Sequence, residues 1–366
     1  MRIPITRPVL GAEEADAVAA VLASRFLVQG PQVAEFERLV ADMVGIEHAV
    51  ALSNCTAALE VGLLSLGIGP GDLVAVTPYS WVATANVIEL CGATPVFVDI
   101  DPDTFNMDAD KLSELFDVRD DVKAVMPVHT FGNPAGISRT CGIAADHGVA
   151  VVEDAACALG SSDRGRMAGS LGTVGCFSFH PRKIITTGEG GMLVTDDDHL
   201  AAFARRYRNH GLEAVDGVAE FVTPGANLRM TEIQGAIGVV QMGRIHQLIA
   251  ERAALTQRFD VELVRLGMTP QARLSTTAVQ SYVALVPDGH LAATVIERLR
   301  GLGIESTIGT TAIPFSHYFS HRYGLSDRDL PVTASIRDRA VTLPLYPGMT
   351  EEEFGTVVAG VEKALR

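Results

Sequence analysis

Short apolar runs alternate with helix-like segments along the first part of the chain. The runs HAVALSN (48–54), LVAVTPYS (73–80) and VAVVEDA (149–155) are largely continuous, which is typical of strands buried on both faces. Between them, TAALEVGLLSLG (56–67) and WVATANVIELCG (81–92) place apolar residues at helical spacing. Strands separated by helices predict a mostly parallel sheet between helical layers, that is, an α/β fold.

Helical periodicity dominates on either side of this alternating region. Residues 12–45 predict two amphipathic helices separated by the break VQGPQ. Residues 231–267 predict one long helical stretch, with Thr231 as its N-cap in a capping box. A strand-like SYVALV and further helical segments follow. We therefore expect a large domain at 1–245 and a smaller C-terminal α+β domain at 246–366.

Composition narrows the class of protein. The chain has 366 residues and is 48% hydrophobic, which is enough apolar material for a large buried sheet. No apolar stretch approaches the roughly 18 residues of a membrane span, and the start lacks the core of a secretory signal. A net charge of −15 argues against a general nucleic-acid binder. Five scattered cysteines without a CxxC favour a reduced cytoplasm and predict neither a disulfide framework nor a metal site.

A lysine with polar neighbours follows one of the predicted strands. Lys183 lies between the apolar run CFSFH (176–180) and the turn-forming GEGG (188–191). A lysine amine is a nucleophile only when neutral, and burial beside polar partners lowers its pKa. Taken alone, however, a loop lysine is most often a solvated cation. A catalytic interpretation therefore depends on other segments.

Two strand ends carry residues that suit an anionic, ring-containing ligand. Asp154 ends the strand VAVVED, where a carboxylate can hold a cationic ring nitrogen or simply cap a helix. SNCTAAL (53–59) passes from strand to helix, where the N–H groups of Thr56 and Ala57 can bind a phosphate. A plain Thr N-cap is the commoner role of such a segment. Ser178 either adds a phosphate hydroxyl or is an ordinary strand serine.

Three further residues allow both a functional and a structural interpretation. Trp81, the only tryptophan, follows a strand end and suits stacking on a planar ring, although core packing is the commoner fate. Arg229 precedes the long helical stretch as either a phosphate clamp or a surface cation. Asn227 either reaches a ligand or shapes the turn.

Taken together, these segments resemble one known family. SFHPRKIITTGEGG, VVEDAACALG, SNCTAAL, TPYSWVATANVIELCGATPVFVDID and NLRMTEIQGAIGVVQM closely resemble the DegT/DnrJ/EryC1/StrS aminotransferases, the pyridoxal-phosphate-dependent sugar aminotransferases of fold type I. LASRFLVQGPQVAEFE and LPLYPGMTEEEF extend the resemblance to nearly the whole chain. Several segments in the family's order are far more specific than one motif. The resemblance implies an aspartate aminotransferase-like fold.

The resemblance also implies roles for residues around the cofactor ring. Lys183 matches the lysine that forms a Schiff base with pyridoxal phosphate. Asp154 matches the carboxylate at the pyridine nitrogen, and Trp81 matches the aromatic position that stacks on the ring. Cys157 stands where the family usually has Gln or His near the ring oxygen. Because a thiol is a weak donor, this contact is expected to be altered.

Phosphate contacts are implied from two subunits. Thr56, Ala57 and Ser178 match phosphate-binding positions of one subunit. Asn227 matches an asparagine that reaches the phosphate from the neighbouring subunit, and Arg229 lies beside it. The resemblance therefore implies a homodimer with shared active sites.

The implied reaction moves an amino group from L-glutamate, through pyridoxamine phosphate, to a keto-sugar nucleotide. The motif around Lys183 resembles that of members acting at a C4 ketone, which favours a 4-keto-6-deoxy sugar. His180 and His317 are candidates for substrate contacts. The segment IGTTAIPFSHYF (308–319) lacks the His-Tyr that many members show, so substrate recognition is where the resemblance is weakest.

Other functions stay open at this point. Family members that act as dehydratases carry His in place of the lysine, which Lys183 argues against, whereas a cyclitol or another ketone is an alternative acceptor. A nicotinamide dehydrogenase would need GxGxxG, but the nearest run, GIGPGD (67–72), ends in Asp and precedes a strand. A non-catalytic regulatory relative that binds the cofactor is the third alternative.

Overall fold

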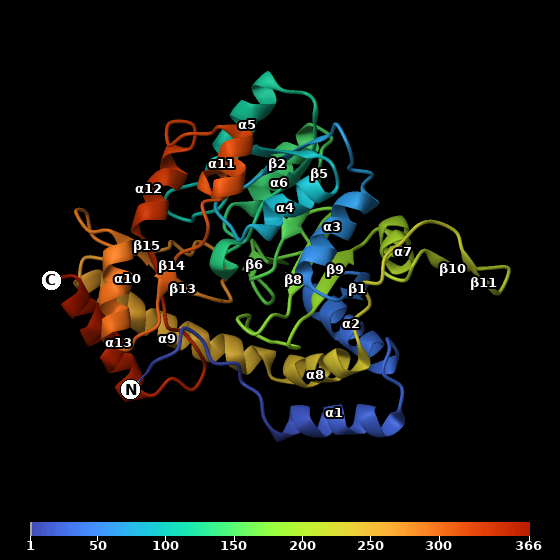
Figure 1. The fold of residues 1–366 in the computed structure, drawn as a ribbon, viewed down its shortest axis with the longest axis horizontal. Coiled ribbons are helices and arrows are strands. Elements are labelled where there is room, and N and C mark those ends of the chain that lie inside the picture. The colour runs from blue at the N-terminus through green and yellow to red at the C-terminus, as the bar shows by residue number, and fades with distance from the viewer. Residues whose placement is uncertain (1) are drawn as a thin grey trace.

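The computed structural model describes residues 2–366, and a three-layer α/β/α unit forms its larger part (Figure 1). Within these residues, the central sheet has seven strands in the order β1-β9-β8-β5-β4-β2-β3. They are β1 (His48–Leu52), β2 (Leu73–Val76), β3 (Thr94–Phe97), β4 (Val122–Met126), β5 (Ala150–Asp154), β8 (Val174–Ser178) and β9 (Gly191–Thr195). The two pairings of β9 are antiparallel and the other four are parallel, so the prediction of a mostly parallel sheet is confirmed.

Helices cover both faces of this sheet, because alternate residues of a strand point to opposite sides. They are α2 (Pro31–Val44), α3 (Cys55–Ser65), α4 (Ala83–Leu90), α5 (Ala109–Val118), α6 (Ile137–Asp146), α7 (Asp198–Tyr207) and α8 (Glu232–Gly243). On one face, the apolar cluster around Val152 includes residues of α3, α4 and α7. On the other face, the cluster around Val151 includes α5 and α6, and the cluster around Phe177 includes α2 and α8.

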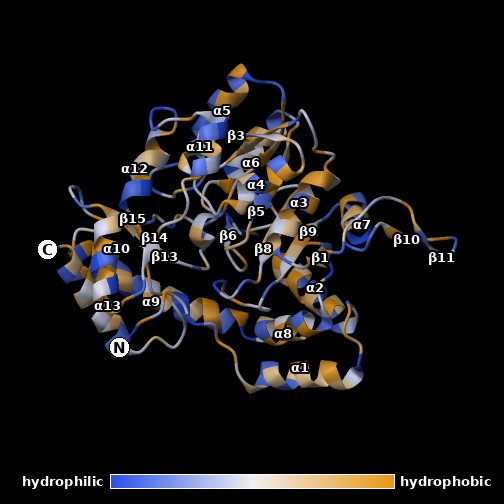
Figure 2. Ribbon diagram, in the orientation of Figure 1, coloured by the Kyte–Doolittle hydropathy of each residue, from blue (hydrophilic) through white to orange (hydrophobic). Residues whose placement is uncertain are grey.

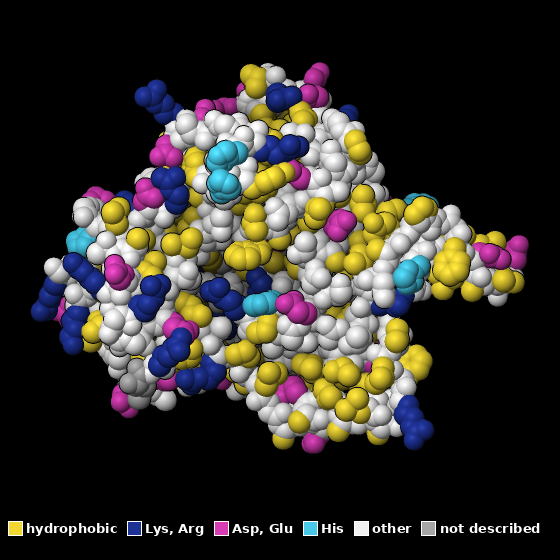
Figure 3. Space-filling model, in the orientation of Figure 1, with side chains coloured by type: hydrophobic (Ala, Val, Ile, Leu, Met, Phe, Trp, Pro, Cys, Tyr) yellow, Lys and Arg dark blue, Asp and Glu magenta, His cyan; other side chains and the backbone are white. Residues whose placement is uncertain are grey.

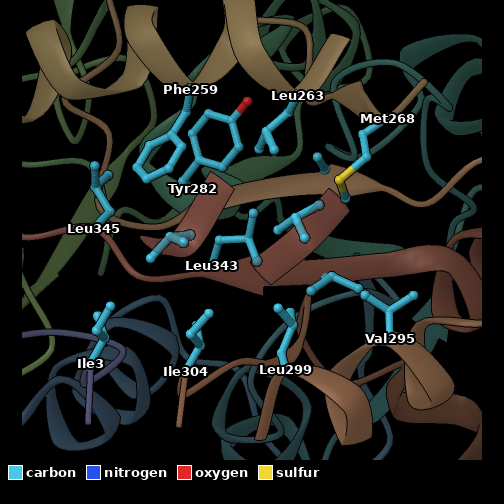
Figure 4. Close-up of a cluster of buried hydrophobic side chains, with 14 of the residues drawn as sticks. Ile3, Phe259, Leu263, Met268, Tyr282, Val295, Leu299, Ile304, Leu343 and Leu345 are labelled. Carbon is cyan, nitrogen blue, oxygen red and sulfur yellow. The ribbon is translucent and has the colours of Figure 1, made fainter. Parts of the chain in front are cut away.

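A second unit forms around a smaller antiparallel sheet in the order β12-β13-β15-β14. Its elements are α9 (Ile245–Arg265), β12 (Thr269–Pro270), β13 (Tyr282–Leu285), α10 (Ala292–Gly301), β14 (Thr307–Ile308), α11 (His317–Tyr323), α12 (Pro331–Arg339), β15 (Ala340–Leu343) and α13 (Glu351–Ala364). Figure 4 shows its core, in which Phe259 and Tyr282 pack above Leu343. Ile3 also lies in this core and pairs with Ile304, so the start of the chain completes the C-terminal unit.

The predicted helices occur at the expected residues, but one of them is interrupted. Residues 12–45 contain α1 (Ala12–Ser24) and α2, as expected. Thr231 caps α8, and its side chain accepts a hydrogen bond from the Gln234 N–H in the predicted capping box. The long stretch at 231–267 is two helices, because the backbone leaves the helical conformation at Arg244 between α8 and α9.

An arm that the sequence pattern did not reveal projects from the larger unit (Figure 1). It is the hairpin β10 (Leu212–Val215) and β11 (Val218–Phe221), which follows α7. Short elements complete the described chain: β6 (Ser162–Asp163), β7 (Arg166–Met167) and the 3₁₀ turns Thr130–Gly132 and Ile313–Phe315. Figure 2 shows apolar residues in the central strands and along α1. Across residues 2–366, the model contains no helix with the length and apolar character of a membrane span.

Candidate active site

Strand register brings Ser178 to the start of α3. Leu52 of β1 pairs with Gly191 of β9, and Gly191 pairs with Ser178 of β8. A Cβ at Gly191 would lie 2.2 Å from the backbone oxygen of Asn54, so only glycine lets β9 pass so close to this helix. The Ser178 hydroxyl and the N-terminus of α3 therefore lie at the same end of the sheet, where β1 and β8 finish.

The N-terminus of α3 differs from the predicted cap. Asn54 is the N-cap, and its side-chain oxygen accepts a hydrogen bond of 2.9 Å from the Ala57 N–H. The interpretation of Thr56 as the N-cap is therefore wrong, and the Ala57 N–H already has a partner. Among the described residues, the N–H of Thr56 has no acceptor. The N–H of Cys55 also has no acceptor among these residues, so the positive end of the helix is open to an anion through Cys55 and Thr56.

Lys183 lies in the loop that joins β8 to β9. The Phe179 N–H donates to the Gly190 oxygen at 2.9 Å, and the Thr187 N–H donates back to the Phe179 oxygen at 3.0 Å. The Ile184 side chain packs in the apolar cluster that also contains residues of α2 and α8. Both ends of the loop and one of its faces are therefore fixed, which gives the lysine a defined place.

The Lys183 amine donates a hydrogen bond of 3.0 Å to the Cys157 thiol. Burial opposes its positive charge, but the nearby Cys157, Cys55 and Asp154 more than offset this, and the pKa of Lys183 is raised. The expectation of a lowered pKa is therefore wrong. Before it can act as a nucleophile, this ammonium group must lose a proton.

Asp154 ends β5 on the sheet face that α3 and α4 cover. Its side chain is only 4% exposed and accepts hydrogen bonds from the Thr84 hydroxyl at 2.7 Å and the Ala156 N–H at 3.2 Å. No helix follows directly, so the N-cap interpretation is wrong. Sequence reasoning missed Thr84, whose one signal was its place in the first turn of α4, close behind Trp81.

The structure excludes core packing for Trp81, whose side chain is 70% exposed. Its carbonyl oxygen accepts a hydrogen bond of 3.2 Å from the Thr84 N–H. Thr84 in turn donates to Asp154. The tryptophan backbone is thus held two hydrogen bonds from the carboxylate, while its indole stays free to stack on a ligand.

Asn227 and Arg229 lie at the same edge of the sheet as the start of α3. The Ser53 N–H donates to the Leu228 oxygen at 2.8 Å, which joins the two segments. The Arg229 guanidinium donates to the Asn209 side chain at 2.6 Å, whereas the Asn227 side chain is exposed. Arg229 is therefore already engaged, and Asn227 is free to reach outward.

The two candidate substrate histidines lie in different surroundings. His180 is half-buried in the loop 179–190 that carries Lys183, called the lysine loop below. Burial lowers the pKa of His180, and the positive charges of Lys183 and Arg182 add smaller contributions of the same sign. His317 is exposed at the start of α11, with its ring 4.4 Å from that of His321. The structure thus groups His180 with the lysine, but no contact within residues 2–366 links His317 to it.

Comparison with known proteins identifies the family. Residues 8–362 match the model of the DegT/DnrJ/EryC1/StrS aminotransferase family. The chain belongs to this family. The aminotransferase is 38% identical to a GDP-perosamine synthase of Caulobacter vibrioides, over 100% of the chain and 98% of that relative. It is 34% identical to the spore coat polysaccharide biosynthesis protein SpsC of Bacillus subtilis, over 100% of the chain and 97% of that relative.

Solved structures agree with this assignment. The putative sugar aminotransferase Spr1654 of Streptococcus pneumoniae in its PMP form superposes with a TM-score of 0.94, at 27% identity over 99% of both chains. The same protein is known in a PLP form, with a TM-score of 0.93. The chain therefore has the aspartate aminotransferase-like fold and is a pyridoxal-phosphate-dependent sugar aminotransferase.

The side chains at this sheet edge of the aminotransferase fit that cofactor. Lys183 supplies a primary amine, and Asp154 accepts only two hydrogen bonds, which leaves acceptor capacity for a cationic ring nitrogen. The Thr56 N–H at the helix start and the Ser178 hydroxyl suit a phosphate. The exposed Trp81 indole offers a flat apolar surface beside them. These donor groups match the amine, ring and phosphate partners that pyridoxal phosphate requires.

Proposed function

We propose that this aminotransferase moves an amino group from L-glutamate to the C4 ketone of a 4-keto-6-deoxy sugar nucleotide. The observation that carries the proposal is the grouping of Lys183, Cys157 and Asp154 at the carboxyl edge of the sheet. The name of the Caulobacter relative points to a nucleotide-linked sugar. The motif around Lys183 favours the C4 position.

Lys183 and Asp154 carry the chemical step in this proposal. Pyridoxal phosphate, when bound, accepts the electron pair that is released as the amino group moves. Lys183 anchors the cofactor between turnovers and, once freed, moves a proton as general base and then as general acid. Asp154 holds a proton at the ring nitrogen, and the Thr84 hydroxyl orients that carboxylate.

The remaining residues hold the cofactor in place. Thr56 and Ser178 bind the phosphate through an N–H and a hydroxyl, and Ala57 contributes through the same helix dipole although Asn54 engages its N–H. Trp81 would stack its exposed indole on the ring. His180 is a candidate substrate contact because it is half-buried in the same loop as Lys183. His317 keeps its proposed substrate contact only if the ligand reaches α11.

A homodimer with shared active sites is part of the proposal. Phe221 on the β10–β11 arm is 73% exposed, and Val218 beside it is also exposed. Phe26 and Leu27, which follow α1, add further exposed apolar surface. Figure 3 shows hydrophobic side chains gathered over α1 and along the arm. Surfaces of this kind mark protein interfaces, and a second copy seated there would bring the exposed Asn227 towards its partner's site.

Two smaller parts of the proposal concern organisation. The domains 1–245 and 246–366 are supported by the helix break at Arg244, although Ile3 packs in the C-terminal core. A cytoplasmic location is supported by the absence of any disulfide among the five cysteines of the described chain.

The visible absorption spectrum of the purified protein with pyridoxal phosphate tests this function. L-Glutamate should bleach the band of the bound cofactor, and the pale protein should then aminate a 4-keto-6-deoxy sugar nucleotide, which mass spectrometry detects. Lys183→Ala should abolish turnover, and turnover that persists in a clean preparation would overturn the mechanism. Amination of a cyclitol ketone alone would show that the acceptor is a cyclitol and not a sugar nucleotide. If no 2-oxoglutarate forms with any acceptor, the result would favour a non-catalytic regulatory protein that binds the cofactor.

A further inference from the structure

Gln280 reaches from the C-terminal unit to the backbone of the lysine loop. It lies just before β13 and is 9% exposed. Its side-chain N–H donates to the Arg182 carbonyl oxygen at 2.8 Å, directly before Lys183. Within residues 2–366, this is the only hydrogen bond between the loop 179–190 and the chain beyond residue 245. The position of the lysine therefore depends on a residue that is distant in sequence.

The backbone of Gln280 is itself held on two sides. Its N–H donates to the Phe131 oxygen at 3.0 Å. Phe131 has a φ of 62°, in the left-handed region that a bulky residue rarely adopts. The strain is tolerated where surrounding contacts fix the backbone, and the bond to Gln280 is one such contact.

The other side is held by Arg252 of α9, a buried cation that is 2% exposed. Its guanidinium donates to the carbonyl oxygens of Gln280 at 3.0 Å and Leu345 at 3.2 Å, and no carboxylate pairs with it among the described residues. Burial lowers its pKa to about 10. Burying an unpaired cation is costly, and the two carbonyl groups that Arg252 fixes are what it gains in return.

We propose that Gln280 is a positioning residue, which sets the place of the Lys183 amine from the C-terminal unit and is itself held by Arg252. The inference rests on the proposed role of Lys183 as the cofactor lysine. A shift of the C-terminal unit would move the Arg182 carbonyl, and with it the amine that faces Cys157 and Asp154. The two units of the chain are thereby coupled at the reacting group.

A matched pair of glutamines tests this proposal. Gln271 is also buried, at 4% exposed, and its side-chain N–H also donates to backbone oxygens, those of Thr104 and Thr130. It lies in the same connection between β12 and β13 but does not touch the lysine loop. Gln280→Met and Gln271→Met each remove a buried donor at similar volume, so both should lose thermal stability.

Only Gln280→Met should change the lysine. We expect its kcat to fall between about tenfold and a hundredfold with the KM for L-glutamate nearly unchanged, because a small misplacement of a reacting group costs that much. The pH at which the absorption of the cofactor-loaded protein titrates should also shift, whereas Gln271→Met should titrate like the wild type. Gln280→His, which restores an N–H donor, should recover part of the loss.

Equal kcat losses in the two methionine variants, or a stability loss alone, would overturn the proposal. If Gln280→Met does not fold, Gln280→Asn withdraws the amide from the Arg182 carbonyl and is judged by the same titration against Gln271→Asn. Failure of the proposed function is distinguishable, because the wild type itself would then release no 2-oxoglutarate, or Lys183→Ala would keep turnover, whatever the Gln280 variants do.

Discussion

Glu153 and Asp154 are consecutive residues of β5, yet their carboxylates point to opposite faces of the sheet and have opposite surroundings. The Glu153 carboxylate is fully buried and lies 2.7 Å from the His129 ring nitrogen. It also accepts three backbone N–H groups, from Gly169, Leu171 and Gly172. The Asp154 carboxylate accepts only Thr84 and Ala156. A carboxylate whose acceptor sites are all filled holds the fold, whereas one with acceptor capacity left can serve a ligand.

The pKa of Glu153 fits this structural role. Burial alone would raise it, but the hydrogen bonds from His129 and from the backbone N–H groups outweigh burial and lower it. Glu153 therefore stays ionised in the folded protein. Because its folded-state pKa lies below the unfolded one, it contributes stability above the unfolded pKa and loses that contribution as the pH falls through the folded pKa.

Asp154→Asn should produce the largest effect on catalysis. The amide cannot hold a proton on the ring nitrogen, so we expect kcat/KM to fall by about 10²- to 10³-fold. The melting temperature should stay close to that of the wild type, because the amide oxygen can keep the Ala156 N–H bond and the amide N–H can donate to the Thr84 hydroxyl. That hydroxyl can in turn donate to the Trp81 oxygen, which lies 3.1 Å away. Steady-state kinetics measures the fall in kcat/KM, and calorimetry measures the melting temperature. A stability loss equal to that of Glu153→Gln would show that the two carboxylates do not differ in role.

Glu153→Gln should show the reverse pattern. An amide nitrogen would face backbone N–H groups, so we expect a loss of about 3 kcal/mol in the free energy of unfolding. Urea unfolding measures this loss, and the activity per folded molecule should change by less than about twofold.

The pH dependence sharpens this second test. The stability difference between the wild type and Glu153→Gln should be larger at about pH 7 than at about pH 4, because acid removes the wild-type contribution. A difference that is independent of pH would mean that the charge of Glu153 is not what stabilises the loop at 169–172.

Thr84→Val should have a smaller effect, confined to Asp154. It removes one hydroxyl donor from the carboxylate, and we expect kcat to fall about tenfold, since a hydrogen bond to a charged group contributes roughly 1.5 kcal/mol. Thr84→Ser keeps the hydroxyl and is the control. Equal kinetics for the valine and serine variants would show that Asp154 needs no orienting donor.

Cys157→Ser should have the smallest effect, and it should be a gain. Burial disfavours the Lys183 ammonium, and Cys157 is the largest influence that opposes burial. Replacing the thiol should therefore lower the pKa of the amine and increase the neutral fraction at a given pH. Stopped-flow absorption should show faster cofactor uptake, by about two- to fivefold near pH 8. Cys141→Ser, away from the lysine, should leave the rate unchanged, and slower uptake in Cys157→Ser would contradict the expectation.

The sequence predicted most of what depends on local pattern. The run VAVVED ends in a carboxylate at the carboxyl edge of a parallel sheet, and β5 places Asp154 there. The capping box at Thr231 was also readable, because it needs residues only three positions apart. The β10–β11 arm was not predicted, because its residues have no buried face from which a period could be read.

The contacts that decide the site join distant residues, and the sequence pattern does not contain them. Thr84 and Asp154 are 70 positions apart, and Gln280 and Arg182 are 98 apart. The sign of the Lys183 pKa shift was predicted wrongly because it depends on a thiol 26 positions away that lies 3.0 Å from the amine. Such pairings follow from packing of the whole chain.

The alternation along β5 has a consequence for how this gene can change. Because side chains in a strand alternate with a period of two, inserting or deleting one codon before Glu153 would exchange the faces of the two carboxylates. A point substitution can remove either the Glu153 contacts to the loop at 169–172 or the Asp154 carboxylate. A length change of one codon would displace both carboxylates at once. Among natural relatives and in mutational libraries, this strand should therefore tolerate amino-acid substitutions but not insertions or deletions.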